Sequence, residues 1–205
     1  MTNLLKKSIS PFLETIKLEG GFFSALAFHQ TRMDETRAAF FDNPEALSLP
    51  LALMKAGSIP PKGLYRVRVI YSEIIESIEF IPYEKREVNS LKLIEANIDY
   101  RYKYEKRPEL NTLFQQKKKC DDILITQNGF LTDTSIANIA LLKEGIWYTP
   151  KSPLLKGTKR AALLHHGLIV EADIHQDDLL SYEKVRLFNA MIEFGEIEFP
   201  AKNIQ

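Results

Sequence analysis

The chain has 205 residues with 45% hydrophobic content, which is enough to bury the core of one large domain or two small ones packed together. Lysine plus arginine and aspartate plus glutamate number 27 each, so no net charge would attract a nucleic-acid backbone or an anionic membrane. The single Cys120 excludes an internal disulfide framework, residues 1–10 lack the apolar core of a signal peptide, and charges interrupt every hydrophobic stretch. We therefore expect a cytoplasmic protein whose partners include neither nucleic acid nor membrane.

The first third of the chain predicts a strand followed by helices. Residues 13–18 alternate apolar and polar side chains and end at Gly20-Gly21, as in a strand that runs into a turn. Residues 22–41 contain neither proline nor glycine and repeat apolar side chains at helical spacing, which predicts a helix. Four prolines between residues 43 and 63 favour one brief helix between irregular connections.

Three more strands are expected before the middle of the chain. Residues 64–72 and 74–83 are rich in β-branched and aromatic side chains and predict an antiparallel pair, with a third strand at 88–94. After residues 95–97 the pattern changes from successive strands to alternating strands and helices. We therefore divide the chain into an N-terminal α+β domain, residues 1–96, and a C-terminal domain, residues 97–205.

The C-terminal domain is expected to mix strands and helices, so the fold class is α+β or α/β. Residues 98–104 alternate aromatic or aliphatic side chains with charged ones, as a strand does, and Pro108 fits the first turn of a helix. The remaining expected elements are strands at 122–125, 138–142, 146–148 and 168–172 and strand pairs within 185–199, a tight turn at Asn128-Gly129 and a helix over 158–166.

Lys103 stands between Tyr102 and Tyr104 at the end of the strand expected at 98–104. An isolated lysine is most often a solvated surface group. In a partly apolar place, however, loss of water disfavours the ammonium form and leaves a neutral amine that can form an imine with an aldehyde. The sequence has no Gly-rich dinucleotide fingerprint, no phosphate-loop signature and no zinc-type His/Cys spacing that would indicate a different cofactor or a metal.

Two other segments carry groups that suit a bound ligand. Asp133 lies among three hydroxyl side chains after the predicted turn, although such a segment is also typical of an ordinary Ser/Thr turn. Residues 157–159, Gly-Thr-Lys, begin a predicted helix, where free backbone N–H groups and the positive end of the helix dipole favour a phosphate. The adjacent His165 and His166 would point about 100° apart on a helix, so they make poor co-ligands.

The order of these features resembles the class IV family of pyridoxal-phosphate enzymes, which contains branched-chain aminotransferases, D-amino-acid aminotransferases and aminodeoxychorismate lyases. In that family a lysine at a strand end is followed by Thr-Glu-x-x-x-x-Asn, then Tyr-Thr-Pro, then Gly-Ile/Val-x-Arg. The similar segments here are Lys103, residues 132–138 (Thr-Asp-Thr-Ser-Ile-Ala-Asn), residues 148–150 (Tyr-Thr-Pro) and residues 157–160 (Gly-Thr-Lys-Arg).

The N-terminal half and the end of the chain extend the resemblance to about residues 13–199. Residues 14–16, Glu-Thr-Ile, are similar to the family's early Glu-Thr strand. Residues 29–33, His-Gln-Thr-Arg-Met, are similar to its His-x-x-Arg-Leu helix, whose arginine meets the cofactor phosphate. Residues 188–191, Phe-Asn-Ala-Met, look like a late turn that contacts the same phosphate.

The resemblance implies the two-domain fold of class IV (fold type IV) enzymes, with pyridoxal 5′-phosphate held as a Schiff base on Lys103. Lys103 would also move protons at the substrate α-carbon as general acid and base. Asp133 would keep the pyridine nitrogen protonated, so that the ring can accept electrons. The phosphate would be held by Arg32, Gly157, the amides of Thr158 and Lys159, and the turn of Asn189 and Ala190.

Two departures from the family pattern bear on this expectation. Asp133 stands where the family usually has glutamate, so the acid reaches the pyridine nitrogen with one methylene fewer, and either the backbone or the cofactor must lie closer. The chain is also shorter than typical members, chiefly in the N-terminal half, where much of the substrate pocket is normally built.

Arg107, four residues after Lys103, favours the lyase branch of the family, because branched-chain aminotransferases carry a tyrosine shortly after the lysine. The resemblance thus implies conversion of 4-amino-4-deoxychorismate to 4-aminobenzoate and pyruvate, a step in folate biosynthesis, with Arg107 as a candidate substrate-binding residue. A transaminase of a small branched-chain or D-amino acid and a non-catalytic scaffold are the alternatives. The resemblance also implies a homodimer that takes a small amino compound near the subunit contact.

Overall fold

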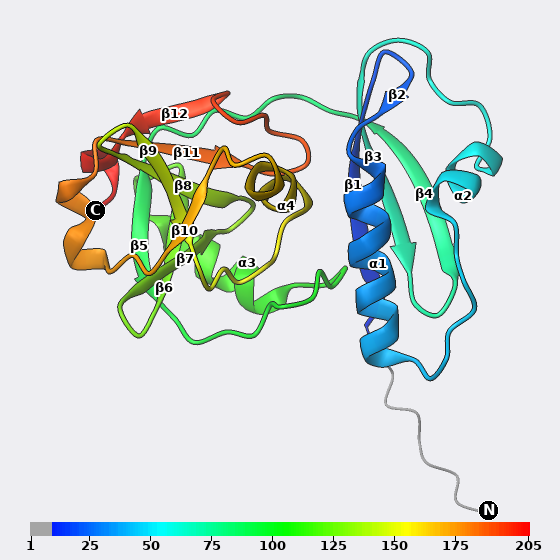
Figure 1. The fold of residues 1–205 in the computed structure, drawn as a ribbon, viewed down its shortest axis with the longest axis horizontal. Coiled ribbons are helices and arrows are strands. Elements are labelled where there is room, and N and C mark those ends of the chain that lie inside the picture. The colour runs from blue at the N-terminus through cyan, green and yellow to red at the C-terminus, as the bar shows by residue number, and fades with distance from the viewer. Residues whose placement is uncertain (1–9) are drawn as a thin grey trace, which may run out of the picture.

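The computed structural model describes residues 10–205, and the N-terminal half of this part is an antiparallel sheet packed by two helices (Figure 1). The strand order is β2-β1-β3-β4. The elements are β1 (Phe12–Glu19), β2 (Phe22–Phe23), α1 (Leu26–Phe40), α2 (Leu49–Lys55), β3 (Leu64–Tyr71) and β4 (Ile75–Pro82). The predicted antiparallel pairing of the third and fourth strands is confirmed.

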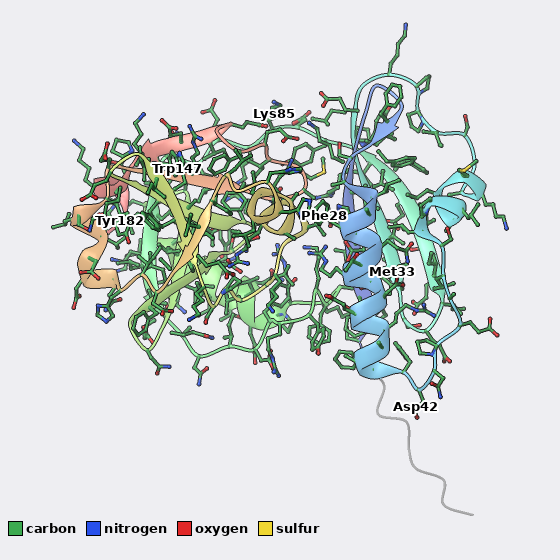
Figure 2. The ribbon with its side chains drawn as sticks, in the orientation of Figure 1. Phe28, Met33, Asp42, Lys85, Trp147 and Tyr182 are labelled. Carbon is green, nitrogen blue, oxygen red and sulfur yellow. The ribbon has the colours of Figure 1, made fainter. Side chains whose placement is uncertain are left out.

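The alternation that predicts the first strand is confirmed, because every second side chain of β1 is buried. Phe12, Ile16 and Leu18 share the buried face with a charged residue, Glu14. That face packs against α1, whose Met33 is completely buried in the same cluster. Figure 1 shows α1 standing between this sheet and the C-terminal half, and Figure 2 shows Phe28 on the side of α1 that faces that half.

The C-terminal half contains two sheets, with strand orders β5-β6-β7 and β10-β9-β8-β11-β12. The strands are β5 (Leu91–Glu95), β6 (Asp122–Gln127), β7 (Phe130–Thr134), β8 (Asn138–Lys143), β9 (Ile146–Pro150), β10 (Val170–Ala172), β11 (Lys184–Phe188) and β12 (Ile197–Pro200). The helices are α3 (Pro108–Phe114), α4 (Thr158–His165) and three short 3-10 turns, Gln115–Lys117, Gln176–Ser181 and Ala201–Asn203. Apart from residues 98–104, the strands predicted in this half, the helix start at Pro108 and the tight turn at Asn128-Gly129 are confirmed within one to three residues.

The main core of the C-terminal half lies between its two sheets. Leu91 and Leu124 from the smaller sheet belong to the same buried cluster as Ile139 and Val185 from the larger sheet. Apolar side chains that face each other across two sheets in this way hold the sheets together. Within residues 10–205, no helix is long and apolar enough to cross a membrane.

The strand predicted at residues 98–104 is wrong, because this segment is a loop whose link to a strand is an isolated bridge between Tyr104 and Phe12. Its aromatic alternation has another cause. Tyr100 packs in a cluster of the C-terminal half, whereas Tyr102 packs in the N-terminal core. The loop thus crosses from one core to the other, and its apolar side chains serve both.

Two further differences concern the N-terminal half. The helix predicted over 22–41 begins only at Leu26, because Phe22-Phe23 pair back onto β1 and Ala25 has a positive φ of 55° that interrupts the helix. The strand predicted at 88–94 is confirmed as β5, but it pairs in parallel with β6 and so joins a sheet of the C-terminal half. The domain boundary near residue 96 stays a prediction, and residues 83–90 connect β4 to β5.

Candidate active site

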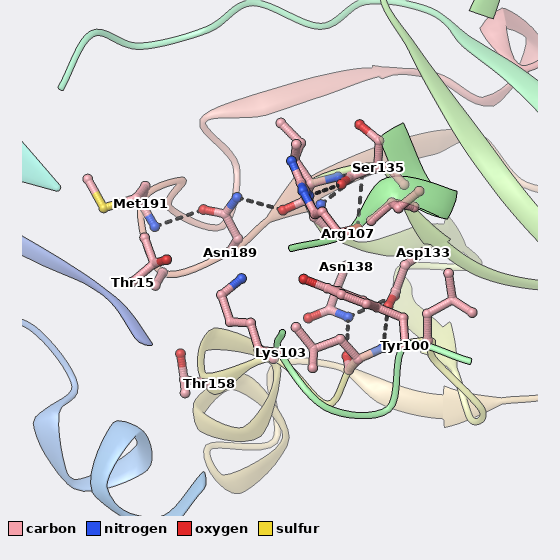
Figure 3. A pocket seen from close by; sticks show the side chains of 18 of the residues that line it. Thr15, Tyr100, Lys103, Arg107, Asp133, Ser135, Asn138, Thr158, Asn189 and Met191 are labelled. Atoms are coloured by element: carbon pink, nitrogen blue, oxygen red, sulfur yellow. Dashed lines mark hydrogen bonds between the residues drawn. The ribbon is translucent and has the colours of Figure 1, made fainter. Parts of the chain in front are cut away.

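The segment that carries Lys103 is fastened to the first strand of the N-terminal sheet. The backbone N–H of Leu13 donates to the Lys103 carbonyl at 2.8 Å. The next residue, Tyr104, forms the bridge with Phe12, and their rings pack with centroids 5.2 Å apart. The backbone around Lys103 is therefore held firmly, while its side chain extends into a cleft (Figure 3).

Both halves of the molecule line this cleft, which holds about 640 Å³ of empty space including the part open to solvent. Thr15 and Arg32 come from the N-terminal half, and the other lining residues come from the C-terminal half and the loop before it. Of the residues predicted from the sequence, the cleft brings together Lys103, Arg32, Asp133, Arg107, Gly157, Thr158, Asn189 and Ala190. Lys159 is the predicted residue that does not line it.

The surroundings of Lys103 disfavour its ammonium form. Burial lowers the pKa of Lys103 to about 7, and the positive charges of Arg32 and Arg107 act in the same direction. The carboxyl groups of Glu14 and Asp133 oppose the shift. An ordinary lysine, with a pKa near 10.5, is almost wholly protonated at neutral pH. Lys103 instead offers a substantial fraction of neutral amine, the form that can attack a carbonyl or accept a proton.

Asp133 is buried in β7, and within residues 10–205 the donors to its carboxyl group are neutral. The side-chain amide of Asn138 donates to Oδ1 and the backbone N–H of Leu155 donates to Oδ2, each at 2.8 Å. Burial raises the pKa of Asp133 to about 7, and these hydrogen bonds offset only part of that effect. A cationic group bound next to Asp133 would therefore fix it as a carboxylate.

Asn138 connects Asp133 to the loop that precedes α4. Its Nδ2 also donates to the carbonyl of Leu155 at 2.9 Å, and its Oδ1 lies so close to Gly157 that a Cβ at that position would collide with it. Glycine at position 157 therefore allows the start of α4 to approach the acid closely.

Arg32 lies on α1 in the wall of the cleft and forms a two-bond ion pair with Glu14. Its Nε donates to Oε1 at 2.9 Å and its Nη2 to Oε2 at 2.5 Å. His29, one turn earlier, lies 2.6 Å from Oε2 through its Nδ1. Although burial alone would raise it, Arg32 and His29 hold the pKa of Glu14 at about 2. Nη1 of Arg32 has no hydrogen-bond partner within the described residues, so it is left for a ligand.

The start of α4 offers backbone donors. Gly157 at the N-cap has no side chain to satisfy the first N–H groups of the helix, which are unpaired within any helix. The Lys159 side chain is engaged elsewhere, since its Nζ donates to Glu193 at 2.6 Å. Lys159 can therefore reach a ligand at this helix end only through its backbone N–H.

The Asn189 side chain shapes the turn that follows β11. Its Nδ2 donates to the Ile136 carbonyl at 2.9 Å, and its Oδ1 accepts from the Met191 N–H at 2.8 Å. Both ends of the side-chain amide are thus used within the protein (Figure 3). What this turn can present to a ligand is mainly the backbone around Ala190, which lines the cleft.

Arg107 ties the Lys103 segment to the loop after Asp133, because its Nη1 donates to the carbonyl of Ser135 at 2.7 Å. Tyr100 lies beside it, and burial raises the pKa of the Tyr100 hydroxyl. Sequence reasoning did not assign Tyr100 or Thr15 to the site. Thr15 stands in the Glu-Thr motif that the resemblance uses, but a position on a strand does not by itself show which cavity the side chain lines.

These groups fit pyridoxal phosphate. A partly neutral amine at Lys103 suits an aldehyde, and Asp133, a buried acid whose hydrogen-bond donors within residues 10–205 are neutral amides, suits a protonated ring nitrogen. The free nitrogen of Arg32 and the N–H groups at the start of α4 suit a phosphate. Together they supply the donors, the acceptor and the nucleophile that such a cofactor needs.

Known proteins resemble this chain in sequence and in fold. The family model for amino-transferase class IV matches residues 109–198. An uncharacterised protein of Haemophilus influenzae is 32% identical over 183 residues, 88% of this chain and 97% of that protein. The crystal structure of a provisionally named 4-amino-4-deoxychorismate lyase from Haemophilus somnus has a TM-score of 0.81 at 34% identity and covers 89% of this chain and 96% of that chain. A provisionally named aminodeoxychorismate lyase of Schizosaccharomyces pombe is 41% identical over 81 residues, 37% of this chain and 35% of that protein.

The fold and the cleft together define a fold-type IV protein, with a lysine and a buried acid in one cleft between two halves. The chain belongs to the class IV aminotransferase family, whose members depend on pyridoxal phosphate. The resemblance drawn from the sequence motifs is thereby confirmed, as is the fold class.

Proposed function

We propose that this chain is a pyridoxal-phosphate-dependent lyase that converts 4-amino-4-deoxychorismate to 4-aminobenzoate and pyruvate. The observation that carries the proposal is the position of Lys103, whose low-pKa amine shares one cleft with the buried acid Asp133 and the cation Arg107. Similarity to the proteins provisionally named as lyases supports this substrate over an amino acid.

Pyridoxal phosphate, when bound, supplies an aldehyde that condenses with amines and a pyridinium ring that stabilises negative charge on the carbon next to the substrate nitrogen. Lys103 would hold the aldehyde end. Asp133 would hold the proton on the ring nitrogen, because a carboxyl group beside a cation loses its own proton more readily than one beside neutral donors. Arg32 and the N–H groups of Thr158 and Lys159 would hold the phosphate.

Lys103 would also carry the proton transfer. Its Nζ, partly neutral near pH 7, takes the proton from the ring carbon that bears the substrate nitrogen. The C–O bond on the neighbouring carbon breaks with the electron pair going to the oxygen, and enolpyruvate leaves. Loss of this proton and this leaving group makes the ring aromatic, giving 4-aminobenzoate, and enolpyruvate takes up a proton to become pyruvate.

Arg107 is the residue that we assign to the acidic part of the substrate. It lines the cleft, and its bond to Ser135 uses one of the five N–H groups of the guanidinium. A guanidinium is well suited to bind a carboxylate through two hydrogen bonds. We also propose, on the family resemblance, that the protein is a homodimer, which sedimentation analysis of the purified protein would test.

Reductive labelling tests the cofactor assignment. The purified protein with pyridoxal phosphate should show a visible absorption band, and borohydride should attach the cofactor to the peptide that contains Lys103. Lys103→Met should abolish both signals. Lys106→Met is the matched control, since Lys106 is exposed three residues away and should leave both unchanged. Attachment to Lys106, or no attachment, would refute the assignment and favour a non-catalytic scaffold.

Product analysis tests the reaction. With 4-amino-4-deoxychorismate, the enzyme should form pyruvate and 4-aminobenzoate over many turnovers while the visible band persists. A panel of L- and D-amino acids without a keto acid should leave the band unchanged. Stoichiometric bleaching by an amino acid that a keto acid then reverses would identify a transaminase instead and would refute the lyase proposal.

A further inference from the structure

His29 is buried at the contact between the two halves and reaches the site through Thr158. It is 1% exposed. Its Nδ1 lies 2.6 Å from Oε2 of Glu14 on β1, and its Nε2 lies 3.4 Å from Oγ1 of Thr158, the first residue of α4. Thr158 lines the cleft. A single imidazole therefore joins a buried carboxylate of one half to a helix start of the other.

The hydrogen in the bond between His29 and Glu14 lies on the imidazole. Both oxygens of Glu14 accept from Arg32, and its low pKa keeps it ionised. An ionised carboxylate has no hydrogen to donate, so Nδ1 of His29 must be the donor. Nε2 of the neutral ring then carries a lone pair. Burial, with the cations Arg32 and Lys103, lowers the pKa of His29 against the effect of Glu14, so the ring is neutral near pH 7 without a ligand.

The lone pair on Nε2 of His29 fixes the direction in which the Thr158 hydroxyl can donate its hydrogen. Facing a lone pair on Nε2, the hydroxyl can only donate to His29, and 3.4 Å is long for such a bond. Its oxygen then turns lone pairs toward the cleft, where they would repel an anion. For Thr158 to donate its hydrogen to an anion, it must instead accept a hydrogen from His29. That exchange requires a proton on Nε2.

We propose that binding of a dianionic group at the start of α4 is coupled to the uptake of one proton by Nε2 of His29. The ring then donates from Nδ1 to Glu14 and from Nε2 to Thr158, whose hydroxyl hydrogen turns to the anion. The proton comes from solvent, and no other bond is made or broken. The imidazolium is stabilised because it lies between two negative groups, Glu14 and the anion, instead of one. His29 is thus a positioning residue that acts on the ligand through Thr158.

The inference rests on the proposed function only in placing the cofactor phosphate at this helix start, and it can be tested without the cofactor. Sulfate is a suitable probe, because it stays a dianion throughout the neutral pH range and cannot react with Lys103. Binding is followed through the backbone amide signals of Thr158 and Lys159, and the state of the ring is followed through the ¹⁵N signals of His29. His29→Gln assigns those signals. His166→Gln, at an exposed histidine just after α4, is the matched control.

Without sulfate near pH 7.5, Nδ1 should be protonated and Nε2 should not. At saturating sulfate both nitrogens of His29 should be protonated, and those of His166 should be unchanged. Saturable binding at the α4 amides with an unprotonated Nε2 would overturn the proposal. Amide signals that do not respond to high sulfate would overturn it as well, since no anion site would then exist there.

A second measurement uses the cofactor. Between neutral and alkaline pH, the dissociation constant of pyridoxal phosphate should rise with pH more steeply in the wild type than in His29→Gln, by up to about tenfold per pH unit for one coupled proton. Lys103 also titrates near neutral pH, but it is present in both proteins, so the difference isolates His29. Equal slopes would count against the coupling. Failure of the Lys103 labelling experiment would refute the lyase proposal and leave the sulfate result standing.

Discussion

Glu14 and Asp133 are buried carboxyl groups, one in each half, with opposite preferences for a proton. Glu14 is 0% exposed with a pKa of about 2, and Asp133 is 5% exposed with a pKa of about 7. Their exposure hardly differs, so burial cannot explain the contrast. The donors can. Charged Arg32, with the His29 ring, meets Glu14, whereas Asp133 receives bonds only from amide groups among the described residues.

Glu14 is therefore a structural acid, whereas Asp133 is an acid suited to bind a cationic ligand. In the N-terminal half, the charge of Glu14 is balanced within the fold, so a ligand changes it little. In the C-terminal half, the charge of Asp133 depends on what binds beside it, because neutral hydrogen bonds do not fully replace lost hydration. A buried acid whose donors are all neutral is therefore a better indicator of a binding site than burial alone.

Glu14→Gln should have the largest effect. It leaves Arg32 in the wall of the cleft without its counter-charge, which should lower the free energy of unfolding by about 3–5 kcal/mol. Urea unfolding near neutral pH measures this. Glu79→Gln is the matched control, since Glu79 pairs with Arg68 at 3.0 Å on the surface and should cost about 0–1 kcal/mol. Equal losses of unfolding free energy in the two variants would contradict the distinction between a buried and a surface ion pair.

The same pair predicts a pH dependence. Because the pKa of Glu14 falls from 4.5 to about 2 on folding, its contribution to stability is present above pH 4.5 and is lost as the pH falls toward 2. The difference in the free energy of unfolding between wild type and Glu14→Gln should therefore shrink as the pH falls from 4.5 toward 2. A difference in unfolding free energy that stays constant over this pH range would show that Glu14 is not ionised in the folded protein.

Asp133→Asn should leave the cofactor bound but lower turnover by a factor on the order of 10². Asparagine keeps the size of the side chain but cannot hold a negative charge opposite the ring nitrogen. Turnover and cofactor content are measured on the same preparation, with Asp178→Asn, at an exposed acid, as the control. Unchanged turnover in Asp133→Asn would mean that another group serves the ring.

Lys103→Met should stabilise the protein without cofactor. The folded-state pKa of about 7 lies below the ordinary 10.5, so the buried ammonium costs stability fully below pH 7, and the cost vanishes as the pH rises to 10.5. Water in the cleft reaches the partly exposed side chain and reduces the effect, so we expect a gain of about 2 kcal/mol at or below pH 7. Urea unfolding at acidic and alkaline pH tests it. A gain that grows with pH would have the wrong sign.

Lys159→Ala should have the smallest effect on the site. Its ammonium pairs with Glu193, and only its backbone N–H faces the helix start, so the cofactor dissociation constant should change by less than about twofold. A tenfold weaker affinity, measured by absorption titration, would place the ammonium on the phosphate instead.

The sequence predicted which residues share the cleft because short motifs in a characteristic order mark them. The family's order of motifs, from Lys103 to Asp133 and on to Gly157, can be recognised in this single sequence. The helix start at Thr158 follows from the rules for helix capping. Whether a residue acts through its backbone or its side chain was not accessible in this way. The partner of Lys159, Glu193, lies 34 residues further along the chain, and no local pattern connects them.

The features that the sequence did not reveal have a common cause in tertiary packing. The loop at 98–104 alternates like a strand because its aromatic side chains enter two different cores. Two of the five N–H groups of Arg32 are directed to Glu14, and its expected role at the phosphate remains a prediction. Both facts depend on how α1 and the loop pack against β1, which periodicity along one segment does not encode.

Lys103 lies on the segment that joins the two halves of the molecule. Its carbonyl accepts a hydrogen bond from the backbone N–H of Leu13 on β1, while Arg107, four residues further on, donates to Ser135 just after β7. The nucleophile is therefore fastened to both walls of the cleft, whereas Asp133 and the start of α4 belong to the C-terminal wall alone. The same contacts thus fix the width of the cleft and the distance between the amine and the acid.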